Sequence, residues 1–197
     1  MERLYDGLIM PPRLAPYQNV ILPIVKGEDN SAVMAFADKL SKDLKAIGVR
    51  VQIDKSDARA PDKMWGAIKR GVPIRVEIGE REVAEGKLTH TRRDLGRESK
   101  TTCTADEFIG SVKDILDAIH NNMLETARAK TRARVYNATT LDEVKKYFTS
   151  GELGFVRMPV EILDNPDYQA FKKENSLSSR CLPFEDEGRM VLIGKSY

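Results

Sequence analysis

The sequence has few cysteines and no long hydrophobic run. Its two cysteines, Cys103 and Cys181, are too few for a disulfide scaffold and are typical of a reducing compartment. No apolar run approaches the ~20 residues that a membrane-spanning helix needs. Residues 1–10 also lack the pattern of a signal peptide. We therefore expect a cytoplasmic protein with no membrane partner.

The sequence also has almost no excess of charge. Thirty-two Lys and Arg residues against 30 Asp and Glu give a net charge of +2, so bulk charge does not by itself indicate a nucleic-acid partner. With 41% hydrophobic and 31% charged residues, the composition is that of a soluble globular protein. A length of 197 residues allows one ordinary domain and a small second one.

A strand, a helix and a second strand are predicted near the start of the chain. Residues 19–25 form a short apolar run typical of a buried strand. From Ser31 to Ile47 apolar residues recur at helical spacing, and Gly48 is well placed to end the helix. Residues 49–53 then alternate as a strand. This order predicts a right-handed βαβ unit with parallel strands.

The most informative stretch runs from residue 53 to residue 79. It contains a polar loop, a short helix with Lys63, Trp65, Lys69 and Arg70, and Gly71 as a stop. Residues 72–79 then alternate apolar and charged side chains, which is the period of a strand with one buried face. We expect this strand to present Arg75 and Glu77 on an open face beside the basic helix.

Two capping boxes and a pair of glycines organise the rest of the chain. Residues 80–86 are predicted as a charged turn and residues 87–93 as an exposed strand. Capping boxes at residues 104–107 and 140–143 open a long helix and a shorter one. The glycines at positions 151 and 154 are interpreted as a boundary.

Beyond this boundary we predict a strand at 155–160, a helix at 166–174 and a last strand at 190–193. The fold class that follows is α/β, with a mixed five-stranded sheet flanked by helices and then a small α/β C-terminal module.

The pattern K-x(7)-G-V-P-x-R-x-E-x-G at residues 63–79 resembles the anticodon-binding domain of class II aminoacyl-tRNA synthetases. Within that group it is most similar to prolyl-tRNA synthetases of the archaeal and eukaryotic type. The phrase GLIMPPRLAPYQ at residues 7–18 resembles the linker that follows the catalytic core, and residues 179–184 and 193–197 resemble the C-terminal extension. The resemblance implies a linker at 1–16, an anticodon-binding domain at 17–150 and an extension at 151–197.

This resemblance implies that the chain is the tRNA anticodon-binding portion of a proline–tRNA ligase. The proline anticodons share two guanines, and arginine can bond a guanine edge through two hydrogen bonds. The residues expected to meet the anticodon are Arg75, Glu77, Arg81, Arg97, Lys63 and Lys69. Alternatively, Arg75 and Glu77 pair only with each other on a solvated sheet face. The expected partners are tRNA(Pro), the catalytic domain and, in the full-length enzyme, a second copy.

Several residues keep two interpretations. Trp65 either stacks on a splayed base or belongs to the core, and we prefer the core. The run of Arg128, Lys130, Arg132 and Arg134 suits tRNA phosphates, or is a solvated helix end whose charges favour the helix dipole. Where the family usually carries an acidic residue, this sequence has Ile68, which cannot accept a hydrogen bond. That base contact is therefore missing, and the anticodon is read either more loosely or by a different residue such as Asp57 or Asp62.

No metal or catalytic site is predicted in this chain. The family's extension often supplies two cysteine pairs, but residues 156–160 and 185–189 contain none. Zinc needs four ligands, so Cys181 alone predicts a module without zinc. His90 and His120 stand alone, and the lack of a histidine near Cys181 also argues against a hydrolase based on that cysteine. The third class II motif is absent, so ATP and Mg²⁺ would be held by a catalytic domain elsewhere.

Two further expectations concern function beyond the anticodon. In the family the chain ends in a tyrosine whose carboxylate lies near the catalytic site, and Tyr197 is expected to dock there. The alternative function is a non-catalytic protein-interaction module that keeps an anticodon-binding fold, which the Ile68 departure leaves open.

Overall fold

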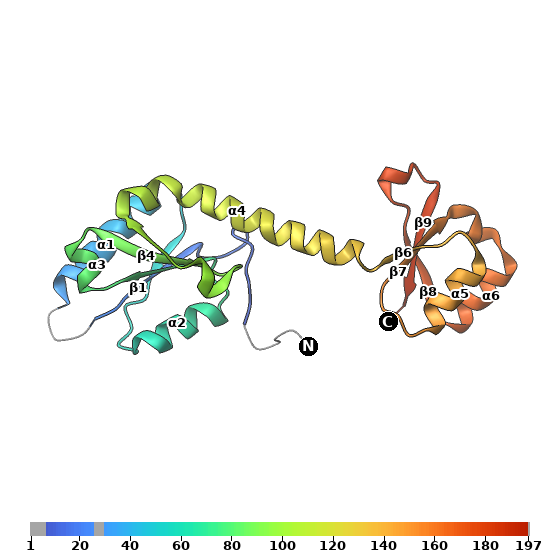
Figure 1. The fold of residues 1–197 in the computed structure, drawn as a ribbon, viewed down its shortest axis with the longest axis horizontal. Coiled ribbons are helices and arrows are strands. Elements are labelled where there is room, and N and C mark those ends of the chain that lie inside the picture. The colour runs from blue at the N-terminus through green and yellow to red at the C-terminus, as the bar shows by residue number, and fades with distance from the viewer. Residues whose placement is uncertain (1–6, 26–29, 197) are drawn as a thin grey trace. The chain divides into compact units, whose positions relative to one another are not determined.

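The computed structural model describes residues 7–25 and 30–196, which fall into two compact units. The first unit is Met1–Glu125 and the second is Thr126–Tyr197. The first contains a five-stranded sheet in the order β2-β1-β3-β4-β5 (Figure 1). Its strands are β1 (Asn19–Pro23), β2 (Val51–Ile53), β3 (Ile74–Ile78), β4 (Lys87–Arg92) and β5 (Thr101–Thr104).

Three strands of this sheet are parallel and two are antiparallel additions. β1 pairs in parallel with both β2 and β3, whereas β4 and β5 follow β3 as antiparallel neighbours. The parallel pairs need crossover helices, which are α1 (Ser31–Ala46) and α2 (Ala60–Lys69). The predicted βαβ unit and the mixed five-stranded sheet are both confirmed.

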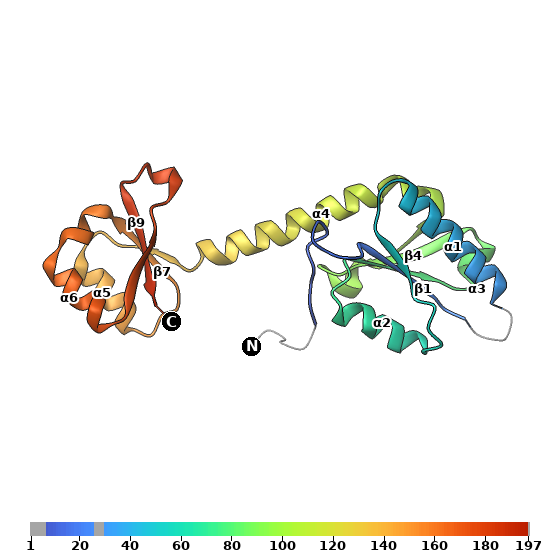
Figure 2. The same ribbon diagram turned by 180° about the vertical axis from the view of Figure 1, so that it is seen from behind.

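The helices cover the two faces of the sheet unequally. On one face α1, α3 (Glu80–Ala84) and α4 (Ala105–Arg132) enclose the main core, whose largest members include Phe108, Leu44 and Ile74. On the other face α2 packs against Val20 and Leu22 of β1 (Figures 1 and 2). Because α2 is short, the β3–β4–β5 part of that face is left to polar side chains.

The second unit is built on a four-stranded sheet in the order β6-β7-β9-β8. Its elements are β6 (Val135–Asn137), α5 (Leu141–Thr149), β7 (Phe155–Pro159), α6 (Pro166–Glu174), β8 (Leu177–Cys181) and β9 (Met190–Lys195). Val144 and Phe148 of α5 and Tyr168 of α6 share one hydrophobic core with β7 and β9. Both helices therefore cover the same face of this sheet.

The boundary between the units lies earlier than the glycines at 151 and 154 predicted. β6 pairs in parallel with β7, and α5 supplies two of the buried side chains of the second core. Residues 126–150 consequently belong with the extension, and the chain passes from one unit to the other within α4. Glycine-rich turns mark the ends of elements, but only packing decides which elements share a core.

Local structure differs from the sequence prediction in three further places. Residues 80–84 form α3 rather than a turn, because the Glu82 carboxylate accepts from the Gly79 backbone N–H and Val83 packs against the main core. β4 was expected to be exposed, yet Leu88, Thr89 and His90 are buried. The short strands β5, β6 and β8 lack the clear alternation that identifies a strand.

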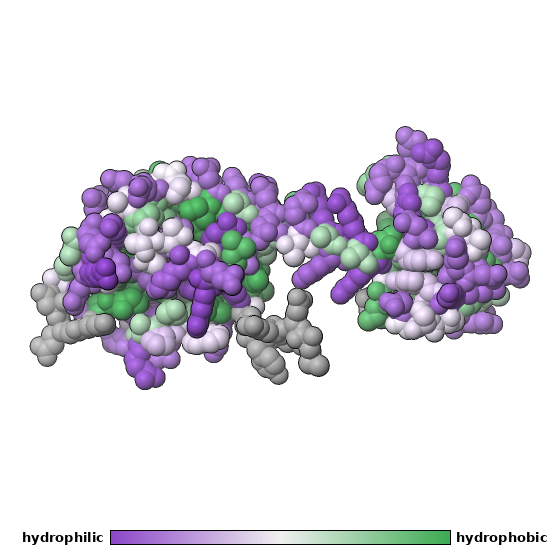
Figure 3. All heavy atoms as spheres, in the orientation of Figure 1, coloured by the Kyte–Doolittle hydropathy of each residue, from purple (hydrophilic) through white to green (hydrophobic). Residues whose placement is uncertain are grey.

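Both capping boxes form as predicted. The Glu107 carboxylate accepts from the Thr104 backbone N–H at 2.8 Å, and the Thr104 hydroxyl accepts from the Glu107 N–H at 3.3 Å. Thr140 and Glu143 make the same exchange at the start of α5. On the face of the molecule that Figure 3 shows, hydrophobic side chains form small separate patches among hydrophilic ones.

Candidate nucleic-acid interface

A polar cluster lies on the part of the sheet that α2 leaves uncovered. In the β3–β4 register Arg75 stands opposite Thr91 and Glu77 opposite Thr89, and Thr89 stands opposite Thr102 of β5. Partners in register point to the same face, so these five side chains share one surface. The Thr89 and Thr102 hydroxyls are 2.9 Å apart and hydrogen-bonded.

Arg75 is more deeply placed than the sequence predicted. Only 5% of its surface is exposed, so the expectation of an open sheet face is wrong at this position. Its Nε is buried without a hydrogen-bond partner. Its terminal nitrogens have no partner among residues 7–25 and 30–196 either, but they are not fully buried. They are the part of the side chain that a ligand can reach.

Positive charge is in excess around Arg75. Burial lowers the pKa of the Arg75 guanidinium; Glu77 opposes this effect, and the like charges of Arg93 and Arg97 add to it. The carboxylate of Glu77 is itself paired with Lys100, because its Oε2 lies 2.9 Å from the Lys100 Nζ. We call Arg75, Arg93, Arg97 and Lys100 the cation cluster. A buried donor without an acceptor, surrounded by like charge, is costly to keep and favours binding of an electron-rich group.

The Arg75–Glu77 pair that the sequence left as an alternative does not form. Glu77 pairs with Lys100 instead, because Lys100 comes directly before β5 and lies across β4 from Glu77. Lys100 and Arg93 are members of the cluster that the sequence analysis missed. The alternation of Thr89, Thr91 and Arg93 along β4 is a signal that places Arg93 on the face of Arg75.

Arg97 is exposed and is held near Arg75 by the turn that follows β4. This turn contains the 3-10 helix η1 (Gly96–Ser99), in which the Ser99 hydroxyl donates to the Gly96 carbonyl at 2.7 Å. Before it, the Nε and one terminal nitrogen of Arg92 donate to the Asp94 carboxylate, at 3.1 and 2.7 Å. Asn122 of α4 donates to the same carboxylate at 2.8 Å. The turn that carries Arg97 is therefore fixed to the helix behind the sheet.

The other predicted anticodon residues are not gathered in this cluster. Lys63 is 5% exposed, and its Nζ lies 3.4 Å from the carbonyl oxygens of both Pro23 and Asp54. Its charge is thus directed inward, against the prediction that it contributes to a surface. Arg81 is exposed on α3 and pairs with Glu85 at 3.2 Å, and Lys69 is exposed at the end of α2.

The α2 helix presents its tryptophan outward. Trp65 is 49% exposed, so the preferred assignment of Trp65 to the core is wrong. Met64 and Ala67 pack against the sheet instead, and the position of Trp65 between them directs its ring away from that contact. Ile68 is partly buried. The carbonyl oxygen of Ile68 lies close to Gly7, so this segment also contacts the start of the chain.

The cationic run after residue 127 lies in the other unit. Arg128, Lys130 and Arg132 are exposed on the last turns of α4, within the second unit. Tyr197 lies outside the described residues, so its docking stays a prediction.

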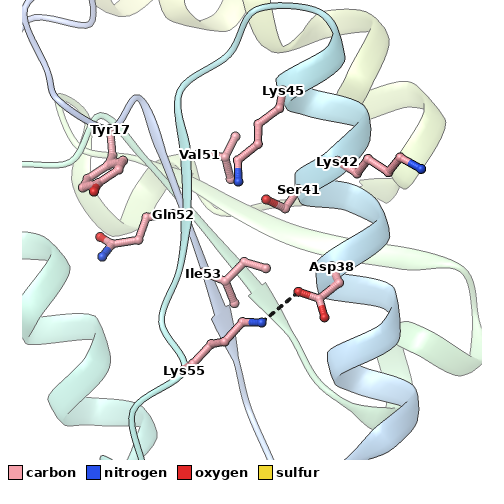
Figure 4. Close-up of a pocket in the computed structure, with 9 residues that line it drawn as sticks. All are labelled: Tyr17, Asp38, Ser41, Lys42, Lys45, Val51, Gln52, Ile53 and Lys55. Carbon is pink, nitrogen blue, oxygen red and sulfur yellow. Dashed lines mark hydrogen bonds and ion pairs between the residues drawn. The ribbon is translucent and has the colours of Figure 1, made fainter.

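A hollow of about 580 Å³ lies along the free edge of β2 (Figure 4). Val51, Gln52 and Ile53 form its floor, and Lys42 and Lys45 of α1 form one side. Figure 4 shows the ion pair of Lys55 and Asp38, whose charged atoms are 3.1 Å apart, across the same hollow. Among the described side chains that line it, no nucleophile is paired with a base.

The described part of the chain contains neither a candidate metal site nor a candidate membrane-spanning helix. Between residues 7–25 and 30–196 no three His, Cys, Asp or Glu side chains converge as a metal site would require. Cys103 and Cys181 are both free and belong to different units. No helix in these ranges combines the length and hydrophobicity needed to cross a membrane.

His90 faces the main core, away from the cation cluster. Its ring packs at 5.1 Å on Phe108, and burial lowers its pKa. This environment is that of a core residue, as expected for a histidine without a catalytic partner.

Comparison with known proteins places these features in a family. Residues 18–115 match the model of an anticodon binding domain. The proline–tRNA ligase of Bdellovibrio bacteriovorus is 34% identical over 96% of this chain and 40% of its own length. That of Chloroherpeton thalassium is 37% identical over 90% of this chain and 36% of its own length. The chain therefore spans less than half of the curated relatives that it matches.

Solved structures agree with the sequence relatives. The prolyl-tRNA synthetase of Giardia lamblia in complex with prolyl-adenylate has a TM-score of 0.83 at 26% identity, over 98% of this chain and 45% of that one. That of Cryptosporidium parvum, with L-proline and AMP, has a TM-score of 0.82 at 23% identity, over 98% of this chain and 44% of the other, which supports the fold. The chain thus belongs to the prolyl-tRNA synthetase family and corresponds to its anticodon-binding portion.

Proposed function

We propose that this chain binds tRNA(Pro) and reads guanine in the anticodon through the cation cluster. The observation that carries the proposal is Arg75, which is 5% exposed and has a buried Nε without an acceptor. Guanine presents two acceptors, O6 and N7, along one edge, and an arginine fork matches that spacing. A base that docks here supplies acceptors to the terminal nitrogens of Arg75, which are the part of the side chain that a ligand can reach.

The surrounding residues divide into two roles. Arg97 lies near Arg75 and Lys100 pairs with Glu77, and both are exposed, so they extend the positive surface towards an incoming loop. Five other exposed cations are suited to backbone phosphates, namely Arg81, Lys69, Arg128, Lys130 and Arg132. Such contacts add affinity but no base specificity. Lys63 is left out, because carbonyl oxygens surround its ammonium.

In the full-length enzyme we propose that a catalytic part uses ATP and Mg²⁺ to join proline to the tRNA bound here. A dimeric, cytoplasmic enzyme and a Tyr197 that helps order the proline site are parts of this proposal. If Tyr197 docks in this way, its deletion lowers aminoacylation by the full-length enzyme and leaves the tRNA affinity of this chain the same. Unchanged aminoacylation contradicts this role.

The test is binding of an anticodon stem–loop with two guanines, compared with the same loop carrying adenines. Wild-type protein should prefer the guanine loop. Arg75→Met should reduce guanine-loop affinity by about 5–150-fold, which corresponds to about 1–3 kcal/mol for a bidentate contact, and should abolish the preference.

Arg59→Met is the control. Arg59 is an exposed arginine beside α2 that pairs with Asp62 at 3.3 Å, so its loss should affect both loops equally. If the wild-type protein binds both loops alike, or binds neither, the proposal is wrong and a protein-interaction module becomes the better interpretation.

A further inference from the structure

Residues 7–16 run along the first unit as an ordered segment, which we call the strap. One part of it is held beside the end of α2. The Met10 N–H donates to the Gly71 carbonyl at 3.0 Å. Gly71 has a φ of +69°, and a Cβ added there would lie 2.7 Å from the Leu8 carbonyl oxygen. Gly71 thus allows both the left-handed turn and the close approach of the strap.

The other part of the strap is held by Arg50. Its Nε donates to the Ala15 carbonyl at 3.0 Å and its terminal nitrogen donates to the Pro12 carbonyl at 2.8 Å. Arg50 lies just before β2, on the far side of the sheet from β4 in strand order. The two ends of the strap are therefore fixed by different parts of the unit.

Arg93 belongs to the cation cluster and also holds the strap. Its Nε donates to the Leu8 carbonyl at 3.2 Å and its terminal nitrogen donates to the Gly7 carbonyl at 3.3 Å. Its backbone N–H donates to Pro73 at 2.8 Å, which continues the β3–β4 register by two residues from the Arg75–Thr91 pair. Arg93 is thus a diagonal neighbour of Arg75 on one sheet face, at the ~7–8 Å typical of such pairs.

Two guanidinium groups in this position repel each other, and both are at least nine-tenths buried. The strap carbonyls offset the repulsion by accepting hydrogen bonds from Arg93. An acceptor that binds Arg75 offsets it from the other side. An acceptor bound to Arg75 therefore favours the hydrogen bonds between Arg93 and the strap. At equilibrium these hydrogen bonds must favour binding of the acceptor to the same extent.

We propose that Arg93 is a positioning residue that couples occupation of Arg75 to the hold on the strap. The inference rests on the proposed function for the identity of its biological ligand. The repulsion between Arg75 and Arg93, on which the coupling depends, is independent of that function. In relatives that are more than twice as long as this chain, a strap fixed more firmly on tRNA binding would orient whatever part of the enzyme precedes it.

The first experiment uses no RNA, so it is independent of the proposed function. Hydrogen exchange is measured at the Met10 N–H, with the Ile24 N–H, which bonds the Ile78 carbonyl at 2.8 Å, as the reference for the body of the unit. Arg75→Met removes the repulsion and should slow Met10 exchange severalfold relative to Ile24. Arg75→Lys retains the charge and should not. Raising the salt concentration should shrink the difference between the two variants.

The second experiment adds the guanine-containing stem–loop. Binding should slow Met10 exchange by at least about fivefold in the wild-type protein, the lower end of usual coupling strengths. In Arg93→Gln the effect should disappear when exchange is measured at a stem–loop concentration that saturates this variant. Arg50→Gln loosens the strap at its other end and should retain the RNA effect. Equal Met10 exchange in Arg75→Met and Arg75→Lys overturns the inference, as does RNA binding without a change at Met10. Failure of RNA to bind, with the Arg75→Met effect present, overturns only the proposed function.

Discussion

Cutting the chain on either side of α5 tests where the second unit begins. A fragment of residues 1–134 ends after α4, and a fragment of residues 1–150 adds β6 and α5 without their partners. If α5 belongs to the second unit, the added residues stay unfolded in the longer fragment. Conversely, a fragment of residues 126–197 should fold, and one of residues 151–197 should not.

The expected magnitudes follow from the buried side chains of α5. Val144 and Phe148 are 0% and 3% exposed, and burying two such side chains contributes about 3–6 kcal/mol in total. A unit of this size has a total stability of about 4–11 kcal/mol. Removing α5 and β6 therefore takes away most or all of the stability of the second unit. In the 1–150 fragment those side chains have no core to enter, and a helix as short as α5 does not persist alone.

Thermal unfolding followed by circular dichroism and residue-level hydrogen exchange provides the measurement. We expect equal melting temperatures for the 1–134 and 1–150 fragments, and unprotected amides across residues 141–149 of the longer one. Protection of those amides, or a gain of more than about 1 kcal/mol over the shorter fragment, would place α5 in the first unit and refute the reasoning; the threshold is the scale of a single well-formed contact.

Three further outcomes are expected. Phe108→Ala should destabilise the first unit by about 3–5 kcal/mol in urea unfolding, because Phe108 is fully buried in the main core, and should leave the transition of the second unit unchanged. If Lys69 contacts a phosphate, Lys69→Met should reduce the slope of log affinity for tRNA against log salt by about 1. Lys63→Met should leave this slope unchanged, and titrations at several salt concentrations measure both. Burial lowers the pKa of His90, so just below the usual pKa of 6.5 the folded state binds fewer protons than the unfolded state. The free energy of unfolding therefore falls as the pH drops from 6.5 to the lowered pKa. His90→Leu should flatten that part of the stability–pH curve, and an unaltered curve would contradict the assignment.

The sequence by itself determined the elements whose signals are local. Alternation along residues 72–79 identified β3, helical spacing identified α1 and α4, and the two capping boxes marked the starts of α4 and α5 correctly. These signals depend on residues a few positions apart, where backbone geometry fixes which side chains share a face. The motif around Arg75 was also local, and the resemblance that it carries led to the family confirmed by comparison.

The tertiary structure alone decided burial and partnership. Lys63 and Trp65 are two positions apart on one helix, yet the lysine points inward to carbonyls and the tryptophan outward, the reverse of their hydropathy. Glu77 pairs with Lys100, and Arg93 bonds a carbonyl 86 positions earlier in the chain. The unit to which α5 belongs depends on β7 and β9, which follow it in the chain. Such contacts join residues whose separation no local period encodes, because they form only when the sheet brings distant strands and turns together.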